Sequence, residues 1–359
     1  MTRIKIVVGC GFGDEGKGQT TYALCSDIIS EEKIVPVVYR FSGGHQAGHT
    51  VVTKSGLKHV FSCFGSGTFL GCPTIWGERC VMDPLQWLLE NEDLKKKIDT
   101  IPLQYFHPNT RITTPYDVIF NQVRRIGGTV GKGVWETIKR DQEGLSLFYE
   151  DLKFPRIVNA KLQSICNYYT DLDRDSEKYS LVDTEKIIQY FTEFYRATRT
   201  FSNDLLDSYI VYEGSQGVLL DPKYGLNSNE FKTPISCIPY WEMLPKEATE
   251  SDVSMYYVCR TYLTKHGSGS AHGIKQYFLN RHETNVDNKF QGTFKHYLFD
   301  SQFINYSISC VERSFKVQSR YIVQTCGDVV SPCDLSKALS DLNLIQICTY
   351  SPDFDTLCK

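Results

Sequence analysis

A glycine-rich stretch near the start of the chain constrains the fold more than any other feature. The apolar run from Ile4 to Val8 is typical of a buried strand, and helical apolar spacing runs from Thr20 to Ile29. Between them stand Gly9, Gly11, Gly13, Gly16 and Gly18. Glycines let a backbone approach a ligand closely, and a helix N-terminus offers unpaired N–H groups to anions. The order predicts an α/β protein with an anion-binding turn, although a tight turn without a ligand would give the same pattern.

This stretch departs from a nucleotide-binding P-loop at two points. Gly11, four residues and Gly16-Lys17 match the P-loop, but Gly18 replaces the Ser or Thr that holds magnesium. Asp14 and Glu15 add negative charge inside the turn, where they would repel a triphosphate. An acid at this place indicates a metal ligand or a proton carrier, with a simple helix cap as the alternative for Asp14.

Composition excludes several classes of protein. The net charge is −3, so no basic field predicts a nucleic-acid partner. No apolar run approaches the roughly 20 residues of a membrane span, and Met1 to Lys5 lead into a strand without a signal-peptide pattern. The 13 cysteines are scattered, without the two-residue spacing of zinc sites. We expect a cytoplasmic protein that binds neither membrane nor nucleic acid.

Other glycine-rich loops also follow expected strands. The strand Val35–Phe41 precedes a loop with His45 and His49, and the strand 209–212 precedes Gln216. Because ligands bind at the carboxyl ends of strands in open α/β sheets, we expect Asp14, His45 and Gln216 to share a pocket. A hydrogen-bonded structural role is the alternative for His45. No repeat or linker divides the chain, so we expect one domain over residues 1–359.

Local signals predict several further elements. Lys54-Ser55-Gly56 is typical of a hairpin turn, and Asp83-Pro84 of a helix start. Asp183 or Thr184 is expected to cap a long amphipathic helix. Late strands are expected at 321–325 and 344–349, whereas the pattern from 144 to 161 is irregular.

Two motifs together resemble the adenylosuccinate synthetase family: GDEGKG at 13–18 and GGHQAGHT at 43–50. The resemblance continues at 80–84, 128–133 and 213–221, and more faintly at 325–329 and 350–353. It implies a P-loop-like NTPase-type α/β fold with a central, mostly parallel β-sheet, helices on both faces and inserted loops. It also implies a homodimer.

The resemblance implies a two-step ligase that uses Mg²⁺. A nucleoside triphosphate phosphorylates the 6-oxygen of a purine monophosphate, and the amine of L-aspartate displaces that phosphate. Asp14 would take the proton from purine N1 and ligate magnesium. His45 would act as a general acid or electrostatic clamp on the moving phosphoryl group, and Lys17 would hold phosphate oxygens.

The resemblance also implies a set of nucleotide-binding residues. The Gly44 carbonyl would be a second magnesium ligand, Gln216 would contact the purine 6-position, and Asp328 would contact the triphosphate's base. The full set is Gly13, Glu15, Gly16, Gly18, Gly44, Thr129, Arg140, Gln216, Thr233 and Asp328. Thr129 and Thr233 would bind the 5′-phosphate, and Arg140, with Lys139 next, would complete that site from the partner subunit.

The sequence departs from the family in three ways. The chain is shorter than the bacterial enzyme, and the Thr-Lys-x-Asp segment that recognises guanine here has Cys326 in place of lysine. The segment 291–296, which matches the aspartate-binding loop, lacks the arginine cluster that suits carboxylates. Lys295 or Arg281 would have to replace it. ATP is therefore an alternative to GTP.

Two alternatives to an IMP ligase follow from these departures. Segments 267–273 and 326–332 resemble a phage branch of the family that joins dGMP and aspartate with ATP. That branch replaces the loop aspartate with Ser or Thr and lacks the histidine, so Asp14 and His45 favour IMP. The missing arginines also fit a nucleotide-binding module that has lost ligation, although binding alone requires neither Asp14 nor His45.

Overall fold

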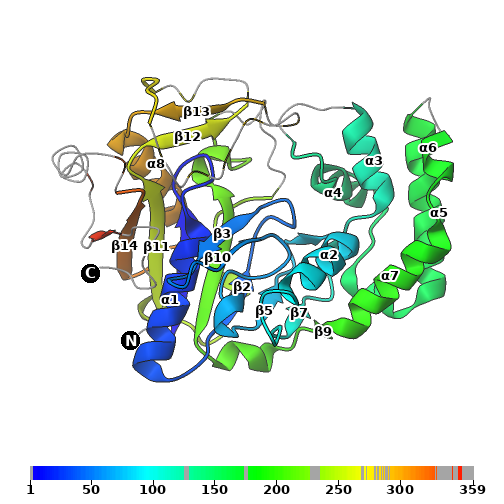
Figure 1. The fold of residues 1–359 in the computed structure, drawn as a ribbon, viewed down its shortest axis with the longest axis horizontal. Helices are drawn as coiled ribbons and strands as arrows, with labels where there is room; N and C mark the ends of the chain where they lie inside the picture. Colours follow the sequence, from blue (N-terminus) through cyan, green and yellow to red (C-terminus); the bar gives the residue numbers. More distant parts are fainter. Residues whose placement is uncertain are drawn as a thin grey trace.

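A parallel β-sheet forms the centre of the protein, seen in a computed structural model (Figure 1). The structure describes residues 3–124, 129–173, 177–226, 235–267, 271, 273–278, 280, 283, 285, 287, 290, 292–327, 329, 342 and 347–349. Within them the sheet has nine strands in the order β15-β14-β11-β1-β10-β2-β5-β7-β9, and every neighbouring pair is parallel. The strands are β1 (Ile4–Gly9), β2 (Val37–Arg40), β5 (Thr74–Trp76), β7 (Gln104–Phe106), β9 (Arg199–Thr200), β10 (Ile210–Gly217), β11 (Val253–Arg260), β14 (Ser319–Thr325) and β15 (Ile347–Thr349).

Helices cover both faces of this sheet, as the family resemblance implies. Alternate side chains of β1 point to opposite faces, because successive strand residues do so. Ile6 packs in the same cluster as Ile304 of α8 (Ser301–Glu312), whereas Val7 packs with Leu24 of α1 (Lys17–Glu32). Burial on both faces explains why β1 is a continuous apolar run. The predicted fold class is confirmed.

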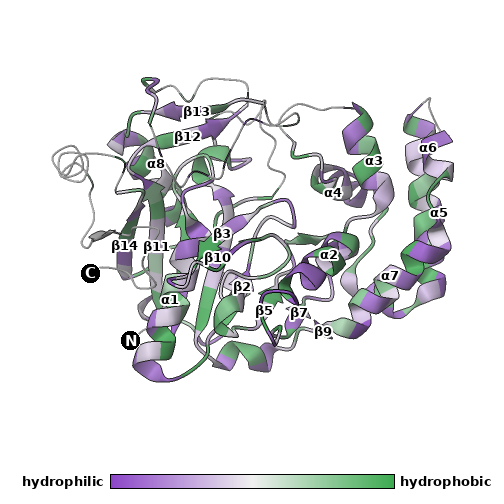
Figure 2. Cartoon of the chain, in the orientation of Figure 1, coloured by the Kyte–Doolittle hydropathy of each residue, from purple (hydrophilic) through white to green (hydrophobic). Residues whose placement is uncertain are grey.

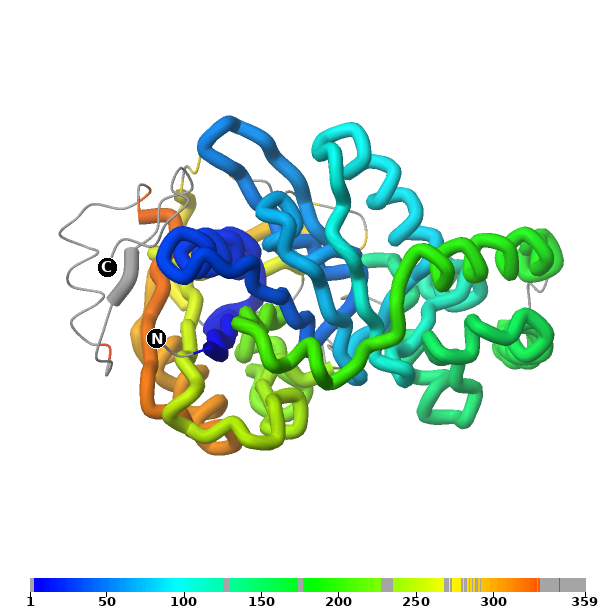
Figure 3. Tube along the Cα trace, turned by 90° about the horizontal axis from the view of Figure 1, so that it is seen from below, coloured from blue at the N-terminus to red at the C-terminus, as the bar shows by residue number. Residues whose placement is uncertain are grey.

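A group of helices forms the end of the molecule opposite β14, beyond β7 and β9 (Figures 1 and 3). It comprises α2 (Pro84–Leu94), α3 (Pro115–Arg124), α4 (Val134–Gln142), α5 (Pro155–Leu172), α6 (Glu177–Ser180) and α7 (Thr184–Ala197). Figure 2 shows hydrophilic and hydrophobic residues alternating along α5 and α7. Their apolar side chains share one core with Trp76 and Phe106 of the sheet. None of the helices described is long and apolar enough to cross a membrane.

Small β-structures and caps match the local sequence signals. β3 (His49–Val52) and β4 (Lys58–Phe61) form the predicted hairpin, and β12 (Leu263–His266) pairs with β13 (Phe294–Tyr297). The Asp83 and Asp183 side chains accept N-capping hydrogen bonds, as predicted. Two-residue strands β6 (Val81–Met82) and β8 (Arg111–Ile112) also pair. Short 3₁₀ turns span Thr68–Leu70, Tyr149–Lys153, Asn203–Asp207, Val218–Leu220, Trp241–Met243 and Glu250–Asp252.

Candidate active site

The candidate site lies at the carboxyl edge of the sheet, where several strands end in loops. Since β1, β2, β10, β11 and β14 are parallel, the loops that follow them leave the sheet at one edge. Three non-glycine residues in these loops have a left-handed backbone: Asp14 (φ 62°), Gln216 (φ 62°) and Cys326 (φ 60°). Such conformations are sparsely populated and gather at functional sites. The geometry therefore makes this edge the candidate ligand-binding site.

The loop after β1 is closed by a buried ion pair. Glu15 Oε1 accepts hydrogen bonds from the backbone N–H groups of Gly11 (2.9 Å) and Gly13 (2.8 Å), and Glu15 Oε2 lies 2.6 Å from Lys17 Nζ. A Cβ atom on Gly9 would lie 2.4 Å from Glu15 Oε2, so only glycine leaves room for this pair. Glu15 is thus used to shape the loop, and it holds the Lys17 ammonium that we expect to bind phosphate.

Asp14 is held by two basic side chains that the sequence did not single out. His266 Nε2 of β12 lies 3.3 Å from Asp14 Oδ2, and Arg260 Nε at the end of β11 donates to the Asp14 carbonyl. Burial alone would raise the pKa of Asp14, but the His266 hydrogen bond and the charges of Arg260 and Lys17 lower it below its usual value. The carboxylate is therefore ionised at neutral pH, as a proton acceptor or metal ligand must be.

Gly18 has a packing role that explains the missing P-loop hydroxyl. A Cβ atom at this position would lie 2.7 Å from His49 Cβ, 3.0 Å from Ser66 Oγ and 3.1 Å from the His49 carbonyl carbon. The start of β3 occupies the space where a Ser or Thr side chain would stand. The glycine therefore lets the second loop, which follows β2 and contains His45, pack against the start of α1.

The loop after β2 is fixed by backbone bonds to β6. Val81 N–H donates to the Gly43 carbonyl and His45 N–H donates to the Val81 carbonyl, at 3.1 and 3.2 Å. The Gly44 carbonyl accepts from Ala47 N–H at 3.0 Å and keeps a second lone pair. His45 Nε2 lies 3.1 Å from the Lys132 carbonyl, and its buried Nδ1 has no partner in the part of the chain that the structure describes. Burial lowers the pKa of His45 to about 4, so the ring is neutral at pH 7.

A buried polar network connects this second loop to β10. His49 Nδ1 lies 2.6 Å from Glu213 Oε1 of β10, and Ser66 N–H donates to Glu213 Oε2 at 3.1 Å. Arg40 lies 4.0 Å from the same carboxylate, and its guanidinium stacks over the Trp76 ring. Burial would raise the pKa of Glu213, but His49 and Arg40 lower it. The network ties the second loop to β10 and hence to Gln216.

The loop between α3 and α4 carries the predicted phosphate ligand Thr129. Its hydroxyl donates to Asn121 Oδ1 at 3.2 Å. Lys132 Nζ in the same loop donates to Gln86 Oε1 at 2.7 Å, and its carbonyl faces His45. The structure thus joins this loop to the second loop through His45.

Arg140, which the resemblance places in the phosphate site of the partner subunit, pairs with Asp117 of its own chain. Its side chain is fully buried, with Nε 2.7 Å from Asp117 Oδ1 and the other nitrogens donating to the carbonyls of Ile112 and Leu145. All three of its side-chain nitrogens donate to atoms within the helical group. Lys139, the next candidate, is exposed on α4.

The remaining predicted residues lie beside the first loop or outside the described residues. Gln216 is the second-last residue of β10, and its Oε1 is 4.0 Å from the position of a Cβ on Gly13. Thr325 Oγ1 donates to the Glu15 carbonyl at 2.7 Å, which places the half-buried Cys326 next to the first loop. Thr233 and Asp328 lie outside the described residues.

Two candidate residues for acidic substrate groups differ in their surroundings. Lys295 Nζ donates to the Gly267 carbonyl at 2.6 Å, near Asp14's partner His266, whereas Arg281 lies outside the described residues. Arg260, which sequence reasoning missed, is paired with Glu283 and with the Tyr262 hydroxyl. The signal that could have found it is its place as the last residue of the otherwise largely apolar run of β11.

The donor atoms at this edge fit magnesium better than a softer metal. Asp14 offers a carboxylate and Gly44 a carbonyl oxygen, both hard ligands. Across the described ranges no group of three or more His, Cys, Asp or Glu side chains could hold a metal ion. Mg²⁺ usually takes one or two protein carboxylates and completes its shell with water and substrate phosphates. The residues present are therefore compatible with an ion that binds together with a nucleotide.

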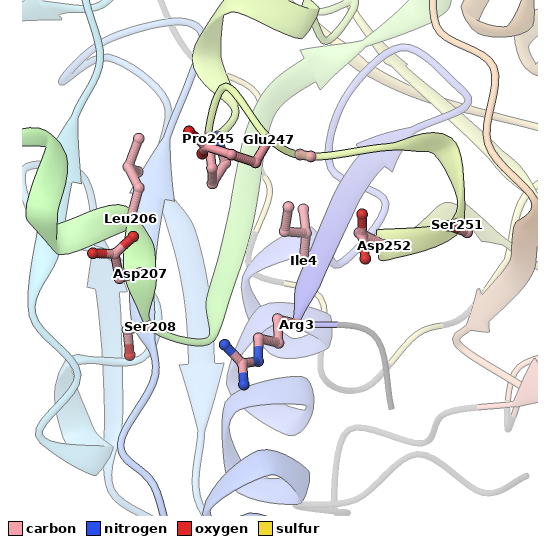
Figure 4. A pocket seen from close by; sticks show the side chains of 10 residues that line it. Arg3, Ile4, Leu206, Asp207, Ser208, Pro245, Glu247, Ser251 and Asp252 are labelled. Carbon is pink, nitrogen blue, oxygen red and sulfur yellow. The ribbon is translucent and has the colours of Figure 1, made fainter.

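A separate hollow of about 770 Å³ lies at the opposite edge of the sheet (Figure 4). Its lining includes Arg3, Ser208 and Asp252, which directly precede β1, β10 and β11 or stand close to their starts. The picture shows the acidic side chains of Asp207 and Asp252 around Ile4. This hollow is at the amino ends of the strands and is not part of the candidate active site.

Comparison with known proteins agrees with this geometry. Residues 6–282 match the sequence profile of adenylosuccinate synthetases, which is more than half of the chain. The chain belongs to the adenylosuccinate synthetase family. Among curated adenylosuccinate synthetases, those of Thermoplasma volcanium and Nitrosococcus oceani are 31% and 29% identical over 246 and 247 residues. These matches cover 62% and 63% of the chain but only 52% and 54% of the relatives, so the chain spans about half of their length.

Solved structures share the fold over a larger part of the chain. An adenylosuccinate synthetase of Plasmodium falciparum superposes with a TM-score of 0.69 at 17% identity, covering 92% of this chain and 78% of that one. The cyanophage S-2L succinoaminodeoxyadenylate synthetase superposes with a TM-score of 0.67 at 14% identity, covering 99% and 94%. At these identities the likeness shows the fold.

Proposed function

We propose that the protein joins IMP and L-aspartate to form adenylosuccinate, with a nucleoside triphosphate as phosphoryl donor. The observation that carries the proposal is the meeting of two loops at one sheet edge, one with the ionised Asp14 and the other with the buried, neutral His45. Phosphate binding alone requires neither group. Together they provide a proton acceptor and a donor for a moving phosphoryl group.

The residues divide the reaction between them. Asp14 accepts the proton from purine N1, which makes the 6-oxygen a better nucleophile. His45 donates a hydrogen bond to the phosphoryl group as charge develops on it, and Lys17 leaves Glu15 to bind phosphate oxygens. Asp14 and the Gly44 carbonyl would hold Mg²⁺, which neutralises phosphate charge. In the second step the aspartate amine displaces phosphate from the purine.

A dGMP ligase that uses ATP is the second candidate, favoured by Cys326. This residue stands where the family has a lysine whose side chain covers the guanine of GTP. The chain therefore lacks one of the contacts that favour GTP over ATP. The cyanophage protein is described as bound to dGMP and dATP. Asp14 and His45 keep IMP as the first candidate.

The subunit arrangement and location are part of the same proposal. We propose a homodimer in the cytoplasm, in which the exposed Lys139 is the candidate to reach the 5′-phosphate of the neighbouring subunit. Small-molecule substrates are its partners.

One set of assays tests the reaction. Purified protein with Mg²⁺ and aspartate is incubated with IMP, GMP, dGMP or dIMP, each with GTP or ATP, and succinyl-purine products are measured by mass spectrometry. We expect product with IMP, and product with dGMP alone would select the second candidate. Nucleotide binding without product in any combination would show that the chain is a non-ligating module.

A further inference from the structure

Thr129 is the first member of a buried chain of three hydrogen-bonded side chains. Its Oγ1 lies 3.2 Å from Asn121 Oδ1, and Asn121 Nδ2 lies 2.8 Å from Glu136 Oε1. Asn121 and Glu136 are 1% and 2% exposed. The second oxygen of Glu136, Oε2, is buried and has no hydrogen-bond partner among the residues described. No part of the proposed reaction uses Glu136.

The direction of these hydrogen bonds opposes phosphate binding. An ionised Glu136 can only accept, so Asn121 turns its NH₂ group toward it and its oxygen toward Thr129. A hydroxyl has one hydrogen, and that of Thr129 is then donated to Asn121. Toward a phosphate, Thr129 presents only lone pairs, and phosphate oxygens are themselves acceptors. Breaking the Thr129 bond would leave the buried oxygen of Asn121 without a donor.

Turning the Asn121 amide by 180° reverses the chain. Its nitrogen then donates to Thr129 Oγ1, which frees the threonine hydrogen for a phosphate oxygen. Its oxygen now faces Glu136, which must carry a proton in order to donate. We propose that Glu136 takes up one proton from solvent when a nucleoside monophosphate binds, and that Asn121 transmits this change to Thr129. The inference rests on the proposed function and on the role that the family resemblance predicts for Thr129, as a ligand of the 5′-phosphate.

The surroundings of Glu136 make both protonation states accessible near neutral pH. Burial is the largest influence and raises the pKa of Glu136 to about 7, and the Asn121 hydrogen bond opposes it. Asp117 of α3 also raises this pKa, and Lys139 on α4 lowers it. From α5, the Tyr169 hydroxyl donates to Asp117 Oδ1 at 2.7 Å, and its oxygen lies 3.3 Å from the Glu136 carbonyl oxygen. Arg140, a further charge on α4, is paired with Asp117.

Calorimetry of the full chain with IMP and with dGMP tests the proposal. Titrations at pH 7 in two buffers of different ionisation enthalpy give the number of protons taken up. With a pKa of about 7, wild type should take up about half a proton more than Glu136→Gln, whose amide can donate permanently. If only protonated Glu136 allows binding, wild-type Kd should rise about tenfold from pH 6 to pH 8 relative to Glu136→Gln. The ligand's own ionisation is common to both proteins and cancels.

Two further variants complete the test. Glu143→Gln removes an exposed carboxylate at the end of α4 and should behave as wild type. Thr129→Val leaves Glu136 in place but removes the hydroxyl that the relay acts on. Its proton uptake on binding should therefore be about half a proton lower than that of wild type, the value expected for Glu136→Gln. This variant tests the relay independently if Glu136→Gln folds poorly. Binding with equal proton uptake in all four proteins would overturn the relay and leave the proposed function standing. Failure of wild type to bind any purine monophosphate would overturn both.

Discussion

Replacing Gly18 by alanine should destabilise the protein, although alanine is the better helix former. Gly18 is the second residue of α1 and has no left-handed backbone that would require glycine. On propensity alone the change would stabilise the helix by up to about 1 kcal/mol. The contacts of the new methyl group predict the opposite sign. The sign of the effect therefore separates a packing role from a merely absent hydroxyl.

The magnitude follows from what the new Cβ would meet. Two of its three nearest atoms, at 2.7 and 3.1 Å, are His49 Cβ and the His49 carbonyl carbon. They belong to β3, which is hydrogen-bonded to β4, and the His49 ring is held by Glu213. They cannot move aside as the end of a flexible side chain would. Overpacking of this kind typically costs about 1–3 kcal/mol, so we expect a net loss of about 1–2 kcal/mol.

Urea unfolding followed by tryptophan fluorescence measures this loss as a lower midpoint at unchanged slope. Gly273→Ala is the matched control, because its Cβ would make an ordinary contact 3.5 Å from Tyr297 Cβ. That variant should stay within about 0.5 kcal/mol of wild type. A Gly18→Ala protein as stable as wild type, or more stable, would refute the packing explanation.

Three further predictions concern charged groups. Asp14→Asn should lower kcat by about 10²–10⁴-fold with monophosphate affinity retained, and unchanged turnover would remove Asp14 from proton transfer. Arg140→Ala should lower the free energy of unfolding by about 3–5 kcal/mol, because Asp117 is left buried without its partner; normal stability in urea would contradict this role. The pKa of Glu136 is raised from 4.5 to about 7 on folding, so the stability of wild type should fall by about 3 kcal/mol as pH rises through this range. Glu136→Gln should lack this decline when unfolding is compared at pH 5 and pH 8, and an equal decline would contradict the raised pKa.

Signals confined to a few neighbouring residues predicted structure well. Asp83 and Asp183 cap their helices because the acceptor and the N–H groups it serves are within three residues. The strand, glycine loop and helix at the start of the chain were likewise predictable, because these three elements follow one another directly in the sequence. The parallel sheet then brings the loop of Asp14 to the same edge as that of His45.

Contacts between distant residues were not predictable in the same way. Arg140 was assigned to a neighbouring subunit, but its partner Asp117 is 23 residues earlier, and spacing does not show which way an arginine faces. The central strand β11 was missed although all of its residues are buried, because no glycine turn marks its end. The start of α5 lies in the stretch 144–161, whose pattern was judged irregular because polar residues interrupt the helical spacing of the apolar ones. His266 reaches Asp14 only through the β12–β13 hairpin.

The fit of glycines in one loop against atoms of another limits how the candidate site could be redesigned. Gly16 faces the Thr325 side chain, Gly18 faces His49, and a Cβ on Gly217 would lie 2.2 Å from the Gly11 carbonyl oxygen. A substitution at the end of β14 that aims to change donor specificity would therefore displace the loop that we expect to bind phosphate. Libraries that randomise one loop at a time should yield mostly misassembled sites. Exchanging the segments around 9–18, 42–50 and 325–327 as a single block is the more promising route to a different nucleotide.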